Sequence, residues 1–137
     1  MLAEIQAADI LSGNKALITL MDSLRQKKID YIPIFTGTPD DTFVKPELVP
    51  WIRITPIPGD TVLYSDDQRM IEYPRIQVDF WVREADYDQI EELQELIMEA
   101  LEDSNYSRYY VNRYSDPDLD GCVMVTANFE GFFERND

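Results

Sequence analysis

The amino-acid sequence contains no histidine. A Ser-His-Asp or Cys-His catalytic arrangement is therefore impossible, and so is any metal site that depends on imidazole ligands. Glycine is also scarce: the five glycines form neither a phosphate-binding loop nor a dinucleotide-binding fingerprint. These absences remove the common routes to hydrolysis and nucleotide binding, and we expect a protein that is not an enzyme and has no cofactor and no metal centre.

Cysteine occurs once, at Cys122, so the chain cannot form an intramolecular disulfide. This thiol lies beside Val123 and Met124, and we expect it to be buried and unreactive. No apolar run approaches the ~18 residues that a membrane span requires. The first residues carry Glu4 and Asp9 where a signal peptide would be apolar, which predicts a protein that stays in a cytoplasm.

Positive charge is in short supply, because 12 Lys and Arg residues face 27 Asp and Glu residues and give a formal net charge of −15. Such a surface repels phosphate backbones and anionic lipids. Binding to DNA, RNA or a membrane surface is therefore disfavoured. Adjacent acids such as Asp40 and Asp41 are expected from this composition and do not identify a general acid and base.

The chain is large enough for one core, since 45% of its 137 residues are apolar and 12% are aromatic. We expect a single domain over residues 1–137. Residues 1–12 form either a helical turn or a loose arm, because Ser12 and Gly13 interrupt the helical pattern. Residues 56–74 read as a projecting hairpin or long loop that is flexible or stabilised by a partner.

Two segments have helical periodicity. The first covers residues 15–28, with Asn14 as its N-cap. The second starts near Asp86, where Gln89 completes a pattern resembling a capping box, and it has an apolar stripe formed by Ile90, Leu93, Ile97 and Leu101. We expect its acidic residues, namely Asp88, Glu91, Glu92, Glu95, Glu99 and Glu102, to form a solvated face.

Strands are expected at residues 31–35, 51–55, 75–83, 109–114 and 123–133, with a small hairpin at residues 62–64 and 70–71. The clearest alternation places Ile76, Val78, Phe80 and Val82 toward the core and Trp81 on the opposite face. The order of elements predicts an α+β fold, with a mostly antiparallel sheet and two main helices packed on one face.

One segment resembles a metal-binding loop. Asp116, Asp118, Asp120 and Gly121 match the opening of an EF-hand calcium loop, but Ala127 stands where a bidentate Glu should complete the coordination. The pattern suits a tight turn between two strands equally well. We favour the turn and leave weak cation binding by these three aspartates open.

The two tryptophans and two of the arginines form a second candidate set. Alternation places Trp51, Arg53, Trp81 and Arg83 on the polar side of their strands. These rings are either covered by a helix or docked against another subunit, and the combination of Arg and aromatic side chains is typical of protein interfaces. Core packing is favoured over contact for the nearby tyrosines, Tyr106, Tyr109, Tyr110 and Tyr114.

Two sequence blocks carry a family resemblance. The block Pro50–Thr55 (PWIRIT), the block Ile76–Trp81 (IQVDFW) and the helix directly after it resemble a tail-component family of long-tailed bacteriophages and of prophages of Gram-positive bacteria. The chain is similar to the tail terminators of this family in length and in element order. Neither block is a catalytic motif.

The resemblance implies a ring, usually a hexamer, that sits on the finished tail tube, stops its polymerisation and joins it to the head. The implied partners are other copies of the chain, the tail tube protein and a head-completion or connector protein, and the implied location is the bacterial cytoplasm during assembly and then the head-tail junction of the virion. It assigns residues 56–74, notably Tyr64, Asp66, Asp67 and Arg69, to contacts with the tube or a neighbour. An acidic lumen would let DNA pass without sticking.

Three other functions remain open. A head-completion or connector protein of the same particle would have similar size and charge. An acidic inhibitor or DNA mimic would be a monomer that binds a basic partner tightly. A hydrolase that uses carboxylates alone would need an acidic pocket and a divalent metal.

Overall fold

The computed structural model describes residues 2–59, 62–65 and 68–134, and of residues 63–65 and 68–70 it describes the backbone alone. The helices are α1 (Ala3–Ser12), α2 (Lys15–Leu24) and α3 (Ile90–Glu102), with short 3₁₀ segments at Pro46–Leu48 and Glu84–Gln89. The strands are β1 (Ile34–Thr36), β2 (Ile52–Pro56), β3 (Val62–Ser65), β4 (Gln68–Glu72), β5 (Arg75–Arg83), β6 (Tyr106–Ser115), β7 (Cys122–Gly131) and β8 (Phe133–Glu134). The chain is an α+β protein, as predicted.

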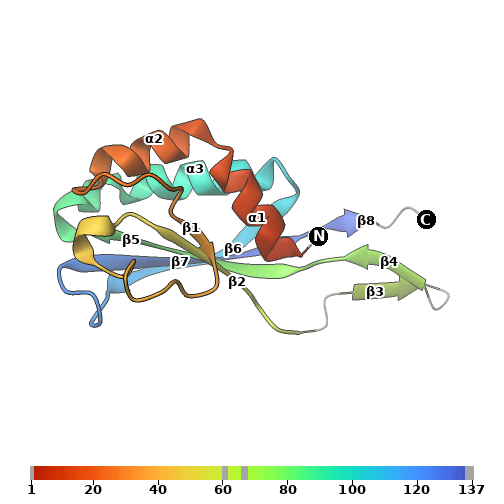
Figure 1. Cartoon of the computed structure of the whole chain (residues 1–137). Helices are drawn as coiled ribbons and strands as arrows, with labels where there is room; N and C mark the ends of the chain where they lie inside the picture. Colours follow the sequence, from red (N-terminus) through yellow and green to blue (C-terminus); the bar gives the residue numbers. More distant parts are fainter. Residues whose placement is uncertain (1, 60–61, 66–67, 135–137) are drawn as a thin grey trace.

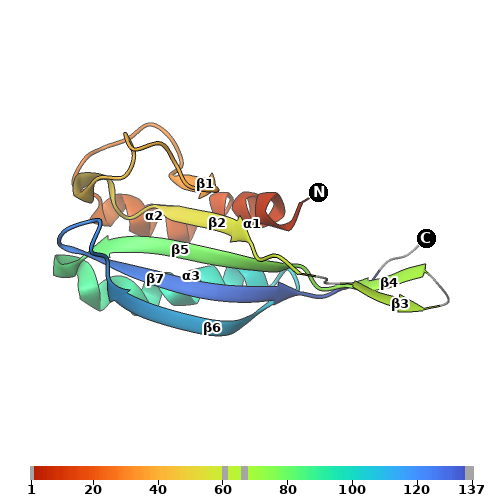
Figure 2. The same cartoon turned by 90° about the horizontal axis from the view of Figure 1, so that it is seen from below.

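The main sheet has five strands in the order β1-β2-β5-β7-β6. The β1 and β2 strands are parallel, and the other neighbours are antiparallel, which confirms the prediction of a mostly antiparallel sheet. Pro33 directly precedes β1, at one edge of the sheet, where a missing backbone N–H is tolerated. The opposite edge is the long strand β6, as Figure 2 shows.

The three helices lie on the same side of this sheet (Figure 1). Two main helices were predicted, and α1 is the addition: Ser12 ends it, and the chain enters α2 after Gly13 and Asn14. The predicted cap is present, because the Asn14 side chain accepts a hydrogen bond from the Leu17 N–H at 3.0 Å. Within the described ranges, no helix combines the length and apolar character needed to cross a membrane.

The predicted end of α2 at residue 28 is wrong, because the helix stops at Leu24. Arg25 takes an extended backbone conformation and turns its guanidinium under the following loop. There it donates to the carbonyl oxygens of Leu48 at 3.1 Å and Pro50 at 2.6 Å, and it pairs with Asp22. Satisfying these buried carbonyl groups is incompatible with another helical turn, so Arg25 anchors a loop instead of continuing the helix.

The apolar stripe of α3 is buried as predicted, whereas its capping box does not form. Asp86 lies in the 3₁₀ segment before α3 and accepts a hydrogen bond from Arg83 at 2.9 Å, while Gln89 occupies the N-cap position and makes no side-chain cap hydrogen bond in the described chain. The acidic residues Asp88, Glu91, Glu92, Glu95, Glu99 and Glu102 are all exposed, which confirms the solvated face.

The main core lies between the helices and the sheet. It contains the predicted residues of β5, together with Ile52 and Ile54 of β2, the apolar stripe of α3, and buried residues of α1 and α2. At one end of this core Tyr106 is fully buried, and its hydroxyl donates to the Gln6 Oε1 atom of α1 at 2.7 Å. This hydrogen bond connects the first helix to the edge strand β6.

Tyr106 should make stability depend on pH under alkaline conditions. Burial, and secondarily the charge of Glu4, raise the pKa of its phenol from 10.0 to about 12. The folded state therefore favours the neutral phenol, so this contribution is complete below pH 10 and is lost as the pH rises toward 12. Between pH 10 and about 12, we expect the free energy of unfolding to fall less for Tyr106→Phe than for the native chain. Urea unfolding followed by circular dichroism measures both. Parallel curves for the two proteins would contradict this assignment.

A second sheet of three strands, in the order β3-β4-β8, extends from one end of the molecule (Figures 1 and 2). The β3 and β4 strands form the predicted hairpin. The predicted single strand at residues 123–133 is divided, because β7 ends at Gly131 and β8 pairs with β4. Gly131 lets the chain pass from the main sheet to the small sheet, because a larger residue would not fit there. A Cβ atom at this position would lie 2.6 Å from the Phe133 ring and 3.0 Å from the Tyr106 ring.

Candidate functional site

A second apolar cluster lies on the face of the main sheet that is turned away from the helices. The rings of Trp51 and Trp81 stack at its centre, with centroids 4.0 Å apart and an interplanar angle of 17°. The other buried members are Val49, Leu119, Cys122 and Met124, with Phe35 and Val44 packed against them. Residues from the segment between β1 and β2 and from the β6–β7 connection therefore complete the cluster.

These contacts correct the prediction for the tryptophans. Trp51 is 2% exposed and Trp81 is 4% exposed, so neither ring is available for a neighbouring subunit. Sequence alternation correctly placed Trp81 on the face opposite Phe80, but the expected cover was a helix. Here the cover comes from connecting segments of the same chain, namely the segment between β1 and β2 and the β6–β7 connection.

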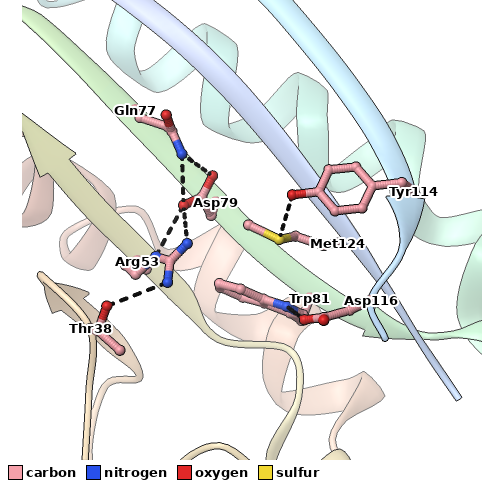
Figure 3. A network of polar contacts seen from close by, with 8 residues as sticks. All are labelled: Thr38, Arg53, Gln77, Asp79, Trp81, Tyr114, Asp116 and Met124. Carbon is pink, nitrogen blue, oxygen red and sulfur yellow. Dashed lines mark hydrogen bonds and ion pairs between the residues drawn. The ribbon is translucent and has the colours of Figure 1, made fainter. Parts of the chain in front are cut away.

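A buried carboxylate organises the polar part of the same face (Figure 3). Asp79 has no exposed surface, and its Oδ2 atom accepts hydrogen bonds from Arg53 Nε at 3.0 Å and Nη2 at 2.8 Å. Gln77 donates to both carboxylate oxygens, at 3.1 and 3.2 Å. Arg53 also donates to Thr38 Oγ1 at 3.4 Å, and its guanidinium lies 5.0 Å from the centroid of Trp81. The network thus joins three segments of the chain.

The two indole N–H groups have different environments. Trp81 Nε1 donates to Asp116 Oδ2 at 2.7 Å, whereas Trp51 Nε1 is buried and has no hydrogen-bond partner among the described residues. The other carboxylate oxygen of Asp116 accepts from the Asp118 N–H at 2.9 Å, which closes a turn. Gly121 completes this connection with φ +77°, so the predicted turn is confirmed.

The aspartates of this turn do not converge. Asp118 and Asp120 are exposed, and both carboxylate oxygens of Asp116 already accept hydrogen bonds from within the chain. In the part of the chain that the structure describes, no group of three or more Cys, Asp or Glu side chains is arranged to hold a metal ion. The turn therefore organises the loop that covers Trp81.

Arg53 and Arg83 were predicted to contact a neighbour, but both have partners within the chain. Arg83 donates to the Leu24 carbonyl oxygen at 2.8 Å and to Asp86 at 2.9 Å, and it attaches the end of α2 to β5. The side chains of Arg53 and Arg83 are 22% and 23% exposed. Their first role is to hold loops and helix ends against the sheet.

The remaining predicted contact residues lie in the small sheet. Tyr64 belongs to β3 and Arg69 to β4, and for both only the backbone is described. Asp66 and Asp67 lie outside the described residues. Their assignment to the tube or a neighbour therefore stays a prediction.

Cys122 is buried in the second cluster, as predicted. Burial, followed by the nearby charge of Asp116, raises the pKa of its thiol from 9.0 to about 11. Since the thiolate is the reactive form, this environment favours an inert cysteine at neutral pH.

The edge strand β6 exposes aromatic residues that sequence reasoning assigned to the core. Tyr106 is buried, but Tyr109, Tyr110 and Tyr114 are 52%, 49% and 44% exposed. The register shifts between Arg108 and Tyr110, which places two tyrosines in succession at an irregularity. The consecutive Tyr109-Tyr110 pair, which breaks the alternation, was the available signal for this bulge.

Comparison with models of known protein families gives no match, and a search of curated proteins also finds none. The function is therefore inferred from the geometry of the chain and from the resemblance of its two sequence blocks.

Proposed function

We propose that this chain is a structural subunit of a ring that caps the tail tube of a long-tailed bacteriophage or prophage and joins it to the head. The two blocks that carry the family resemblance support this proposal, because they occupy adjacent paired strands. Ile52 of β2 lies opposite Phe80 of β5, and Ile54 lies opposite Val78. The resemblance therefore covers one contiguous part of the main sheet.

The projecting sheet β3-β4-β8 is the observation that carries the proposal. It extends beyond the layer of helices (Figures 1 and 2), and a small sheet gains stability by packing against another surface. Contact with a tube subunit or a neighbouring copy would supply such a surface. An arm of this kind suits a protein that must grip the end of a polymer.

The charge of the chain fits the same role. The net charge is −15, and the outer face of α3 presents a row of exposed carboxylates, from Glu91 to Glu102. A ring of such subunits repels DNA phosphates from its wall and lets the genome pass through the lumen without adhering. The partners in this role are other copies of the chain, the tail tube protein and a head-completion or connector protein.

Removal of the projecting arm tests the proposal. Residues 59–73 would be replaced by Asn-Gly, which favours a two-residue hairpin between β2 and β5. We expect the native protein to form rings, seen by sedimentation velocity and negative-stain microscopy. The shortened chain should keep its circular dichroism spectrum but lose ring formation or binding to the end of isolated tail tubes.

Other outcomes would redirect the assignment. A native protein that stays monomeric at high concentration and binds a basic protein tightly would contradict the proposal and indicate an acidic inhibitor. Rings that bind the head portal but never the tube would indicate a head-completion protein instead. A shortened chain that still forms rings and caps tubes normally would exclude the arm from assembly.

A further inference from the structure

The arm formed by β3, β4 and β8 joins the main sheet without a break in strand register along two of its three strands. The pair Arg75–Glu130 ends the pairing of β5 with β7, and three residues farther out on both strands lies the pair Glu72–Phe133 of β4 and β8. Neither strand gains or loses a residue at the junction. Figure 1 shows β4 and β8 continuing past the ends of β5 and β7. The arm is therefore an extension of two neighbouring strands of the main sheet.

The connection between β2 and β3 does not keep the register. The chain advances six residues from Pro56 to Val62, whereas the facing strand advances four residues from Glu72 to Ile76. A further register shift lies within the pairing of β3 with β4. Because β3 is joined to the main sheet by this longer connection, the direction of the arm is set by β4 and β8.

Backbone hydrogen bonds hold the chain at the base of β8. The Gly131 N–H donates to the Pro74 carbonyl oxygen at 2.7 Å, between β5 and β4. The Phe132 N–H donates to the Asn105 carbonyl oxygen at 3.0 Å, just after the end of α3. The base of β8 is therefore bonded to the two strands of the junction on one side and to the helical layer on the other.

The side chain of Phe133 anchors the same strand. Its ring packs edge-on against Tyr106, with centroids 5.4 Å apart and an interplanar angle of 70°. Tyr106 is fully buried and donates to Gln6 of α1, so Phe133 packs against the end of the main core. The preceding residue, Phe132, is 52% exposed. Two successive phenylalanines thus differ in whether they contact the core.

The β4 strand is the middle strand of the arm and pairs with β3 on one side and β8 on the other. Without β8 the arm would be a two-stranded hairpin, which is marginally stable in water. We propose that β8 is a strap that fixes the direction of the arm, so that the arm is already formed before it meets a partner. Two residues, Phe133 and Glu134, make this strap.

A preformed arm lowers the cost of binding. A flexible segment loses conformational entropy when a partner orders it, whereas a fixed segment has lost that entropy on folding. In the proposed ring, every copy would present its arm at the same angle. The strap itself is a property of a single chain, and it depends neither on the identity of the partner nor on ring formation.

Distances between two spin labels on one chain test the strap. The native Cys122 is buried, so the labels attach to introduced cysteines, Ser65→Cys at the end of β3 and Glu95→Cys on the exposed face of α3. The labelled chain is diluted into an excess of unlabelled chain, so that any assembly carries one labelled copy. With β8 in place we expect a single narrow distance distribution in pulsed electron paramagnetic resonance.

Two changes to the strap have matched controls. Ending the chain after Gly131 removes β8, whereas ending it after Glu134 keeps β8. Phe133→Ala removes the anchor on Tyr106, whereas Phe132→Ala removes an exposed ring. Each strap variant should broaden the distance distribution about twofold or more, because the hairpin loses its third strand or its anchor. Both controls should keep the native width, and circular dichroism should show all four chains folded. If the chain that ends after Gly131 does not fold, the comparison of the two alanine variants carries the test.

Two results would overturn the proposal. A distribution in the native-length chain as broad as in the strap variants would show that the arm moves even with β8 present. Equally narrow distributions in all chains would show that the arm is held without β8. The assembly state is measured separately by sedimentation velocity: a native chain that stays monomeric but has a narrow distribution would retain the strap and contradict the proposed ring.

Discussion

Replacing Arg53 with methionine is expected to lower the free energy of unfolding by about 3 kcal/mol. The reason is the carboxylate of Asp79, which has no exposed surface and receives two hydrogen bonds from this guanidinium, at 2.8 and 3.0 Å. Loss of the cation leaves that carboxylate buried, with Gln77 as its remaining donor. Urea unfolding followed by circular dichroism measures the effect.

A second substitution separates the pair from simple packing. When Asp79→Leu is added to Arg53→Met, no unpaired charge remains, and we expect more than half of the lost stability to return. The matched control is Arg75→Met, which breaks the pair with Glu130. Both of those side chains are about 40% exposed, so water screens the pair and the loss should be much smaller than for Arg53→Met. Equal losses for Arg53→Met and Arg75→Met would contradict the importance of the buried pair.

Trp81→Ala is expected to lower the free energy of unfolding by about 3 to 5 kcal/mol, because it opens a cavity in the second cluster. The ring of Trp81 is 4% exposed, stacks on Trp51 and lies under the Arg53 guanidinium. Its Nε1 atom also holds the β6–β7 connection through Asp116. Thermal and urea unfolding, followed by far-ultraviolet circular dichroism, avoid the change in tryptophan fluorescence.

Two phenylalanine variants isolate the hydrogen bond from the packing. Trp81→Phe leaves Asp116 without its indole donor, whereas Trp51→Phe removes a buried N–H that has no partner in the chain as described. Trp81→Phe should therefore be less stable than Trp51→Phe by about 1 to 2 kcal/mol. Asp116→Ala alone should reduce stability by a similar amount. When both phenylalanine variants also carry Asp116→Ala, most of the difference between them should disappear. Equal losses in the two phenylalanine variants would show that the bond to Asp116 contributes nothing.

Periodicity predicted the elements that bury one face along a regular repeat. The alternation in β5 placed Phe80 and Trp81 on opposite faces, and the stripe of α3 from Ile90 to Leu101 is buried. Asn14 was identified as a cap because its short polar side chain can accept from the first turn of α2. Each of these features depends on interactions within a few residues or on a repeat that the sequence displays directly.

The errors share a different origin, which is a polar partner that lies outside the periodic pattern. Arg25 appeared to belong to a helix because it follows a regular pattern, but carbonyl groups near residue 50 bind its side chain and end α2 early. Asp86 appeared to be a cap, but Arg83 takes its carboxylate. In both cases the polar side chain has a partner that the periodic pattern does not predict.

The candidate surface shows the same division. Composition established the acidity of the chain and the absence of histidine chemistry, and alternation established which strand residues share a face. The exposure of those residues depends on loops that return from elsewhere: the segment after β1 and the turn at Asp116 bury both tryptophans, while Tyr109, Tyr110 and Tyr114 stay about half exposed. Periodicity reports the direction of a side chain because backbone geometry sets it, whereas burial requires a second segment whose position follows from packing across the whole fold.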